Sequence, residues 1–593
     1  MADDARRDWE RRIGRRSDPA VARVAQRLPP PDRVETEGGA GQVTVRWSRV
    51  KGAIGYLVLR DGEPIDHGGR DVLASSGPSY CDTTGERGRR YAYSVASLAD
   101  VGAEPGDASE PVEAASTASP AAPLELRVDA ARVTGQLDRV WRMVGSEHLS
   151  QLFYGEGPGG SDIGREFAEA LELARDELGV ESVRAHAILH DELEVYGDDG
   201  EVRLDGIFRV YDRLLELGVR PVVELSFMPR ALAADPKPSI FEYRGLISPP
   251  ADWERWAALN ATLAAGLVDR YGIEEVERWG FEVWNEANLE VFWSGTQADY
   301  FRLYETAARA IKEVDARLLV GGPSTAAAGW IVDFLDFVLE GEIPLDFLST
   351  HTYGNWPVDV REALRSRGLD DVQVWWTEWG VTPTHFYNVT DSVYGAPFVL
   401  HGMKSAQGRL DALAYWVVSD HFEELGRAER LLHGGFGLLT IGNLRKPRWW
   451  ALALAQQLGD DLLQLELGGD GAASLVDAWA ARHEDGTIDI LAWNGTLQQA
   501  KADGDALLDR ALHVSVDGLD GRWEASVARV DREHSNLAAR WDRSRDWPTT
   551  KEWEALHAED RLDEEELGML DRVELELPLP QPGVLRLRLR PRG

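Results

Sequence analysis

Cysteine is almost absent from this sequence, which has a single one, Cys81, among 593 residues. One thiol excludes an intramolecular disulfide. The first seven residues, Met1 to Arg7, also lack the apolar core that a secretory signal needs. From these two absences we expect a cytoplasmic protein.

Basic residues and long apolar runs are also scarce. The sequence has 64 lysines and arginines against 101 aspartates and glutamates, which gives a formal net charge of −37. So acidic a chain repels nucleic-acid phosphates and anionic lipids, and no apolar run reaches the roughly 20 residues that span a bilayer. We therefore expect neither nucleic acid nor membrane as a partner. The acidic charge can serve solubility alone, so the expected partner is a neutral molecule.

Metal and nucleotide motifs are missing too. The 13 histidines form no His-Glu-x-x-His or comparable cluster, and there is no cysteine pair. The glycine-rich segment 155–160 lacks the Gly-Lys-Ser/Thr ending of a phosphate-binding loop. The sequence therefore predicts no metal site and no cofactor.

The apolar pattern changes several times along the chain, as expected for a length that exceeds one hydrophobic core. The predicted regions are a charged N-terminal tail or short terminal helix (1–31), a small β-sandwich (32–117), a linker and lead-in (118–145), a strand–helix alternation (146–460) and a C-terminal β-sandwich (461–593). An acidic helical insert is predicted within the last region, around residues 552–570.

Aromatic residues in region 32–117 follow a known order. Trp47 comes early, Tyr56 follows, and Tyr91 lies two residues before Tyr93. This order resembles a fibronectin type III domain, with Tyr91 where its corner tyrosine stands. The resemblance implies a spacer or packing partner more than a sugar-binding module.

Strands and helices alternate regularly through residues 146–460. Apolar strand candidates lie near 149–154, 181–188, 219–226, 278–285, 317–322, 345–350, 372–378 and 412–418, with helical patterns between them, such as 253–271, and a last helix at about 447–458. Eight such units are typical of a (β/α)8 TIM barrel, whose strands are buried on both faces. A doubly wound sheet is the rival fold. It is disfavoured because each polar cluster directly follows a strand, where a barrel gathers its active site.

Two glutamates follow tryptophan-rich apolar runs at the ends of the fourth and seventh predicted strands. They are Glu286, after Trp284 and Asn285, and Glu378, after Trp376 and Thr377. Glycosidic bonds are cleaved by two carboxyl groups, one that protonates the leaving oxygen and one that meets the positive charge at the anomeric carbon. We assign Glu286 as the acid/base and Glu378 as the nucleophile. In a retaining enzyme they would lie about 5–5.5 Å apart, and in an inverting one about 9 Å apart.

Segment 281–289, with Phe292 and Trp293, is similar to the acid/base motif of glycoside hydrolase family 39, which includes β-xylosidases and α-L-iduronidases. Further similar segments run in the family's order at 183–186, 224–229, 321–325, 349–353, 377–379, 419–424 and 433–437, and segment 530–536 resembles the xylosidase branch. One position departs from the pattern: Ala287 stands where the family commonly has proline.

The resemblance implies a set of substrate-binding residues: His186, Asn285, His351, Tyr353, Glu423 and Glu424. Asn285 would bond the 2-hydroxyl of the sugar, and the two histidines and Tyr353 would line the same subsite. Glu423 and Glu424 would accept hydrogen bonds from distal hydroxyls. Taken singly, each histidine could instead be a satisfied core group and each glutamate a solvated loop residue.

We therefore expect a retaining, exo-acting glycosidase, with β-xylosidase activity on short oligosaccharides as the first hypothesis. A uronidase is the alternative, in which Arg427 or Arg430 would pair with the substrate's carboxylate. An alternative of another class is a non-catalytic carbohydrate-binding protein. The resemblance is also compatible with a homo-oligomer.

Overall fold

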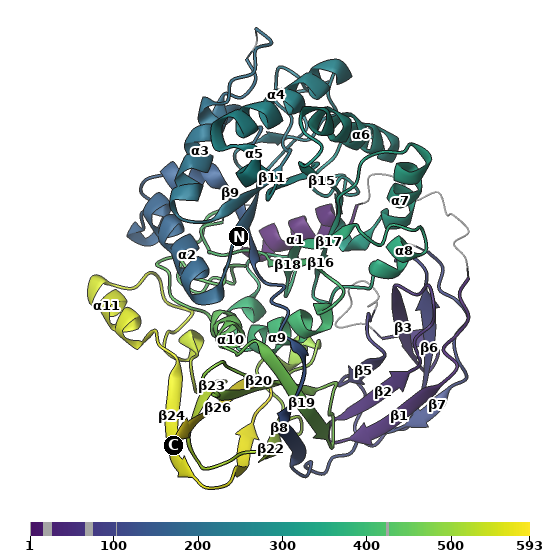
Figure 1. The fold of residues 1–593 in the computed structure, drawn as a ribbon, viewed down its shortest axis with the longest axis vertical. Helices are drawn as coiled ribbons and strands as arrows, with labels where there is room; N and C mark the ends of the chain where they lie inside the picture. Colours follow the sequence, from purple (N-terminus) through teal and green to yellow (C-terminus); the bar gives the residue numbers. More distant parts are fainter. Residues whose placement is uncertain are drawn as a thin grey trace.

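The structure is a computed structural model that describes residues 2–15, 27–65, 75–101, 103–197, 199–422 and 426–592. A closed barrel of eight strands forms its centre, and two β-rich regions lie side by side below the barrel in the view of Figure 1. This confirms the predicted TIM barrel. Within the described ranges, no helix is both long and apolar enough to cross a lipid bilayer.

The barrel strands are all parallel and follow one another in chain order. They are β9 (Met143–His148), β10 (Ser182–His186), β11 (Arg220–Glu224), β14 (Gly280–Glu282), β15 (Leu319–Thr325), β16 (Phe347–Tyr353), β17 (Gln373–Gly380) and β18 (Ala412–Tyr415), and β18 pairs with β9 to close the ring. Parallel strands leave their carboxyl ends at one rim, so the polar residues that end them meet there.

Helices surround the barrel. They are α2 (Ile163–Leu178), α3 (Asp205–Glu216), α4 (Trp253–Tyr271), α5 (Ile273–Val276), α6 (Gln297–Val314), α7 (Ile331–Glu340), α8 (Arg361–Arg365), α9 (Gly395–Ala406) and α10 (Pro447–Gln456). Local sequence fixes their ends: Thr296 and Asp299 form a capping box at the start of α6. A short hairpin of β12 (Ser239–Ile240) and β13 (Gly245–Leu246) lies in the long connection that follows β11.

The first barrel strand lies before its predicted position. The sequence predicts a strand at 149–154, but the strand is β9, and Leu149–Phe153 form a 3-10 helix. β9 carries Gly145, Ser146 and Glu147, all buried, so it lacks the apolar run of its neighbours. Gly145 is needed there because an added Cβ would lie 2.2 Å from the Trp416 ring.

The N-terminal β-rich region consists of two antiparallel sheets. One holds β1 (Val34–Gly39), β2 (Gln42–Trp47) and β5 (Ser79–Asp82), and the other β4 (Glu63–Pro64), β3 (Gly55–Arg60), β6 (Tyr91–Leu98) and β7 (Val112–Ala114). Their inner faces share one core, in which the rings of Trp47 and Tyr56 lie 5.4 Å apart. The described part of this region is thus built of short antiparallel strands.

The C-terminal β-rich region is a single nine-stranded sheet, in the order β24-β23-β26-β21-β20-β19-β8-β22-β25. Its strands are β8 (Leu124–Gln136), β19 (Asp461–Gly468), β20 (Val476–Arg482), β21 (Ile488–Asn494), β22 (Arg510–Asp517), β23 (Arg522–Val530), β24 (Asp563–Leu570), β25 (Glu574–Leu579) and β26 (Gly583–Arg592). Apolar residues from most of these strands form one core. Strand β8 precedes the barrel, so the expected linker and lead-in contributes a strand to this sheet.

The predicted acidic helix at 552–570 is only half correct. Helix α11 covers Thr550–Glu559, and Asp563–Leu570 form the edge strand β24 instead. Glutamates are good helix formers, but here they pair across strands: Arg529 bonds Glu565 at 3.0 Å, and Arg586 bonds Glu564 at 3.0 Å. β24 also pairs with β23 along its length, so tertiary strand pairing overrides the local helix propensity.

Helix α1 (Ala2–Ile13) lies within the expected N-terminal tail. Its Trp9 side chain is only 2% exposed and belongs to the core of the barrel region. The sequence predicts either a charged tail or a short terminal helix here, and residues 2–13 form a packed helix.

Candidate active site

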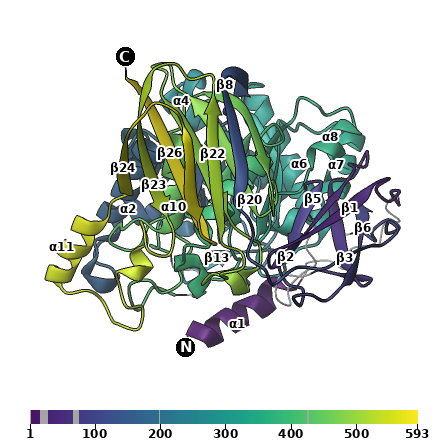
Figure 2. The same cartoon turned by 90° about the horizontal axis from the view of Figure 1, so that it is seen from below.

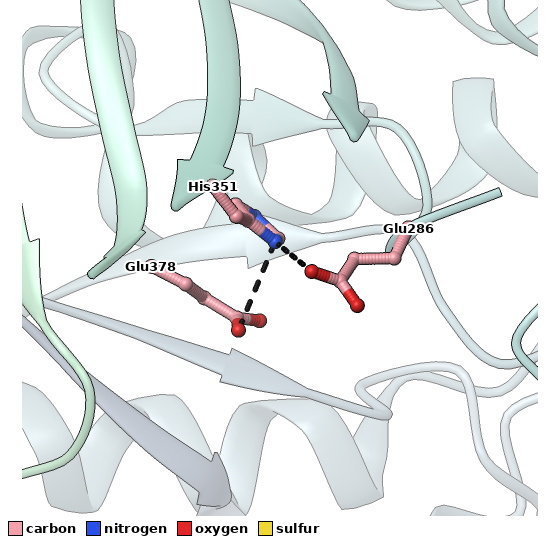
Figure 3. Close-up of side chains that lie close together, drawn as sticks. All are labelled: Glu286, His351 and Glu378. Atoms are coloured by element: carbon pink, nitrogen blue, oxygen red, sulfur yellow. Dashed lines mark hydrogen bonds and ion pairs between the residues drawn. The ribbon is translucent and has the colours of Figure 1, made fainter. Parts of the chain in front are cut away.

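Glu286 and Glu378 lie together at the carboxyl ends of the barrel strands. Glu286 follows β14 and Glu378 is in β17, and both side chains are buried, with 7% and 4% of their surface exposed. One carboxylate oxygen of each and a ring nitrogen of His351 all lie within 4.8 Å of one another. Figure 3 shows the His351 ring beside both carboxylates. This short separation fits the spacing of a retaining pair and not the about 9 Å of an inverting one.

The backbone at Glu286 is in the left-handed region, with φ of 45°. A non-glycine residue in this region is strained and needs support from its surroundings. The support is a hydrogen bond of 2.8 Å from the Glu286 amide to the carbonyl of Ser324, at the end of β15. The turn after β14 is thereby held against the neighbouring strand.

Arg184 is the cation at the centre of the site. Its side chain in β10 is fully buried, and its guanidinium bonds Glu282 at 2.8 Å, Glu224 at 2.7 Å and one oxygen of Glu378. The same group donates to Asn285 Oδ1 at 2.8 Å. The charges of these carboxylates outweigh burial and raise the pKa of Arg184, so it stays protonated.

Glu378 is held between a cation and a hydroxyl. One oxygen pairs with Arg184, and the other accepts a 2.6 Å hydrogen bond from the Tyr353 hydroxyl. Burial raises the pKa of Glu378 above its ordinary value, and Arg184, His186 and the Tyr353 hydroxyl lower it part of the way back. We infer that these partners keep this buried carboxylate ionised.

His351 is neutral. Burial, together with the charges of Arg184 and His186, lowers its pKa well below the ordinary value. Its Nδ1 lies 2.9 Å from Glu286 Oε1, and its Nε2 lies 3.3 Å from the Ser324 hydroxyl. Nε2 also lies 3.1 Å from the Thr377 hydroxyl, which donates its proton to Glu282 at 2.7 Å. We therefore assign the ring proton to Nε2, which donates to Thr377, and Nδ1 is left as an acceptor facing Glu286.

His186 and Asn285, two more of the expected substrate contacts, also lie at this rim. His186 bonds Glu224 at 2.9 Å through Nδ1, and its Nε2 lies 3.8 Å from Glu378. Asn285 directs its oxygen to Arg184, and its amide nitrogen has no partner among the described residues. That nitrogen is therefore available to donate to a ligand.

Two expected residues, Glu423 and Glu424, lie outside the described residues. In the uronidase alternative, Arg427 would pair with the substrate's carboxylate. Its guanidinium carbon lies 5.9 Å from the centre of the Tyr154 ring.

Sequence reasoning missed several residues of this network: Arg184, Glu224, Glu282 and Ser324. A signal was present for Arg184, because a charged residue in an apolar barrel strand, two positions before His186, must point to the same side of that strand. Glu282 gave a similar signal, as a carboxylate within the apolar run before Glu286. Their pairing depends on barrel closure, which spacing in the sequence does not measure.

The three atoms from Glu286, His351 and Glu378 are also close enough to hold a metal ion. However, Arg184 already neutralises one oxygen of Glu378, and a second cation there would be repelled. The donor set therefore fits paired carboxyl chemistry better than metal binding.

Arg184→Met should move the acidic limb of the pH profile of kcat/KM to higher pH. Arg184 lowers the pKa of Glu378, so its removal raises that pKa, and activity is then lost earlier as the pH falls. Removing the cation that the buried Glu224 and Glu282 share should also cost about 3–5 kcal/mol of unfolding free energy. The Arg184→Lys variant keeps the charge and should show a smaller shift. A limb that stays in place in Arg184→Met would contradict this role.

Known proteins resemble this chain over the barrel and the C-terminal sheet. The model of the family described as glycosyl hydrolases family 39 matches residues 124–561. A β-xylosidase of Caldicellulosiruptor saccharolyticus is 33% identical over 444 residues, which are 70% of this chain and 87% of that protein. A β-xylosidase of Geobacillus stearothermophilus is 32% identical over 382 residues, covering 58% of this chain and 74% of that protein.

A solved structure shares the fold. The crystal structure of a monomeric β-xylosidase from Caulobacter crescentus CB15 superposes with a TM-score of 0.69 and 30% identity, covering 79% of this chain and 100% of that one. The family match spans both catalytic candidates and most of the chain. The chain belongs to glycosyl hydrolase family 39.

Proposed function

We propose that this protein is a retaining, exo-acting β-xylosidase that removes xylose from short oligosaccharides, with Glu286 as acid/base and Glu378 as nucleophile. The observation that carries the proposal is the pair of buried carboxylates with oxygens within 4.8 Å, at the ends of β14 and β17. The sugar is proposed from the two relatives named as β-xylosidases.

In the first step, Glu378 attacks the anomeric carbon while the proton of Glu286 passes to the leaving oxygen. The carbon–oxygen bond to the leaving group breaks, and an ester between the sugar and Glu378 forms. Arg184 and Tyr353 hold the Glu378 carboxylate in place before the attack.

In the second step, Glu286 acts as base. It takes a proton from a water molecule, whose oxygen attacks the anomeric carbon and breaks the ester, so that Glu378 leaves as a carboxylate. In the first step the protonated Glu286 carboxyl donates to His351 Nδ1, 2.9 Å away, and this contact orients the acid. Two inversions give net retention of the anomeric configuration.

Asn285→Ala should lower kcat/KM on a β-xyloside on the order of 10²-fold, because the amide nitrogen is proposed to donate to the sugar 2-hydroxyl, a bond that strengthens in the transition state. On the matching 2-deoxy substrate, the same variant should lose less than about 3-fold. Asn285→Asp should behave like the alanine variant, since aspartate can accept from Arg184 but cannot donate. Equal losses on both substrates would contradict the contact.

A panel of nitrophenyl glycosides tests the choice of sugar. The β-xyloside is expected to give the highest kcat/KM. If the β-xyloside stays intact while other glycosides are cleaved, the xylosidase proposal is wrong. An iduronide cleaved in an Arg427-dependent manner would favour the uronidase instead. If neither Glu286→Ala nor Glu378→Ala changes any measurable hydrolysis rate, the two glutamates are not the catalytic pair and the proposed enzyme mechanism fails.

We further propose that the N-terminal sandwich is a fibronectin type III-like spacer. Its strand order, with three strands facing four, supports this. The Tyr91 hydroxyl also accepts a 2.9 Å hydrogen bond from the Glu86 amide, the bond to an upstream backbone group that a corner tyrosine makes. Contacts such as Asp470 with the Ala40 amide, at 2.6 Å, seat this region on the C-terminal sheet.

A further inference from the structure

Helix α1 lies against the loops that follow the catalytic strands. The indole nitrogen of Trp9 donates to the carbonyl of Pro383, which follows β17, at 3.3 Å. The Trp9 ring lies 6.0 Å from the ring of Phe292, in the loop that follows β14. Just beyond α1, the carbonyl of Arg15 accepts a 3.1 Å hydrogen bond from the amide of Glu290 in the same loop.

These two loops begin at the two proposed catalytic residues. Glu286 leads into the loop of Glu290 and Phe292, and Glu378 lies near the start of the loop of Pro383. In the barrel, β15 and β16 separate β14 from β17, so a side chain that contacts both loops lies over the gap between them. Figure 1 shows α1 in line with the centre of the barrel, and Figure 2 shows it at the outside of the molecule.

A third contact reaches the proposed sugar subsite. The Trp9 ring lies 6.4 Å from the ring of Phe241, and Phe241 stacks on the His186 ring at 5.8 Å. His186 in turn lies 3.8 Å from Glu378. Trp9 is thus one aromatic ring away from a residue of the site.

We propose that α1 covers the leaving-group side of the catalytic site, with Trp9 as its anchor, and so limits the length of substrate that the enzyme accepts. Glu286 protonates the leaving oxygen, so the loop that follows it lines the leaving-group side, and this is the loop that α1 contacts. The proposal rests on the proposed glycosidase function and adds the element that sets substrate length. Both α1 and Trp9 lie outside the segment that the family model matches.

The anchor is necessary because a 12-residue helix is marginal by itself. The burial of Trp9, at 2% exposure, and the packing of Ile13 on the same core are the contacts that hold it. Arg11 and Asp8, by contrast, are exposed and pair with each other at 3.0 Å. Truncation of Trp9 should therefore release α1, and truncation of Arg11 should not.

The test compares kcat/KM on xylo-oligosaccharides of two and six sugars in the full-length protein. Trp9→Ala is expected to raise the six-to-two ratio about tenfold, because the longer leaving group no longer meets α1. Trp9→Phe, which keeps an apolar ring, should stay close to wild type, and Arg11→Ala is the matched control on the same helix. A ratio that is unchanged within about twofold in Trp9→Ala overturns the proposal.

Hydrogen–deuterium exchange gives a readout that does not depend on catalysis. Segments 289–293 and 381–385 should exchange faster in Trp9→Ala than in wild type or Arg11→Ala. Unchanged exchange there would overturn the seating of α1 on these loops. If the wild-type protein cleaves other glycosides but no xylo-oligosaccharide, the proposed function alone fails, and the length ratio is measured on the series that it cleaves.

Discussion

Glu378→Ala is expected to lower kcat/KM on an aryl β-xyloside by on the order of 10⁵-fold, because the ester intermediate cannot form without its carboxylate. The substitution leaves a small space beside Arg184 and Tyr353, which bind the two oxygens of Glu378. Azide should enter this space, restore turnover of an activated aryl xyloside, and give a glycosyl azide of inverted configuration. The measurements are initial rates and the product configuration by NMR.

A matched control separates loss of the nucleophile from disruption of its network. Glu282→Gln alters another carboxylate bound to Arg184, at 2.8 Å, and should lose far less activity than Glu378→Ala, with no response to azide. Circular dichroism confirms that both variants fold. If azide rescues neither variant, or rescues both equally, Glu378 is not the nucleophile.

Glu286→Ala is expected to lower kcat/KM by about 10²–10⁴-fold for leaving groups that need protonation. A dinitrophenyl leaving group departs without a proton, so the first step on that substrate should remain fast. Hydrolysis of the ester then lacks its base, and the ester should accumulate with a burst of dinitrophenol. Stopped-flow absorbance measures the burst, and mass spectrometry identifies the ester on Glu378.

The dependence on the leaving group is the feature that identifies an acid/base residue. His351→Ala, which removes the ring bonded to Glu286 at 2.9 Å, should show a smaller loss with the same dependence, since the acid remains but is less well oriented. Equal losses of Glu286→Ala on good and poor leaving groups would rule out the assigned role.

Most of the barrel could be predicted from the sequence because its elements carry strong local patterns. The bounds predicted for α4 match the observed Trp253–Tyr271, and seven of the strand candidates overlap a barrel strand. The first strand could not be placed, because Gly145, Ser146 and Glu147 fit the barrel through contacts with distant residues such as Trp416. Strand β8 was missed for a related reason: its partners β19 and β22 lie beyond the whole barrel in the chain.

The candidate site could be predicted in part. Strand order was enough to bring Glu286, His351 and Glu378 to one rim, where they lie together. The role of Arg184 could not be read from spacing, because its partners lie in or just after β11, β14, β15 and β17, which come together only when the barrel closes. Likewise, the contacts of Trp9 with Pro383 and Phe292 join residues far apart in the sequence and could be seen only in the folded chain.

The stereochemistry of hydrolysis tests the central claim most directly. Proton NMR of a fresh reaction on an aryl β-xyloside distinguishes the first anomer formed from the one that appears later by mutarotation. A pair of carboxylates with oxygens within 4.8 Å predicts that β-xylose forms first. The appearance of α-xylose first would mean inversion, and would contradict a glycosyl ester on Glu378.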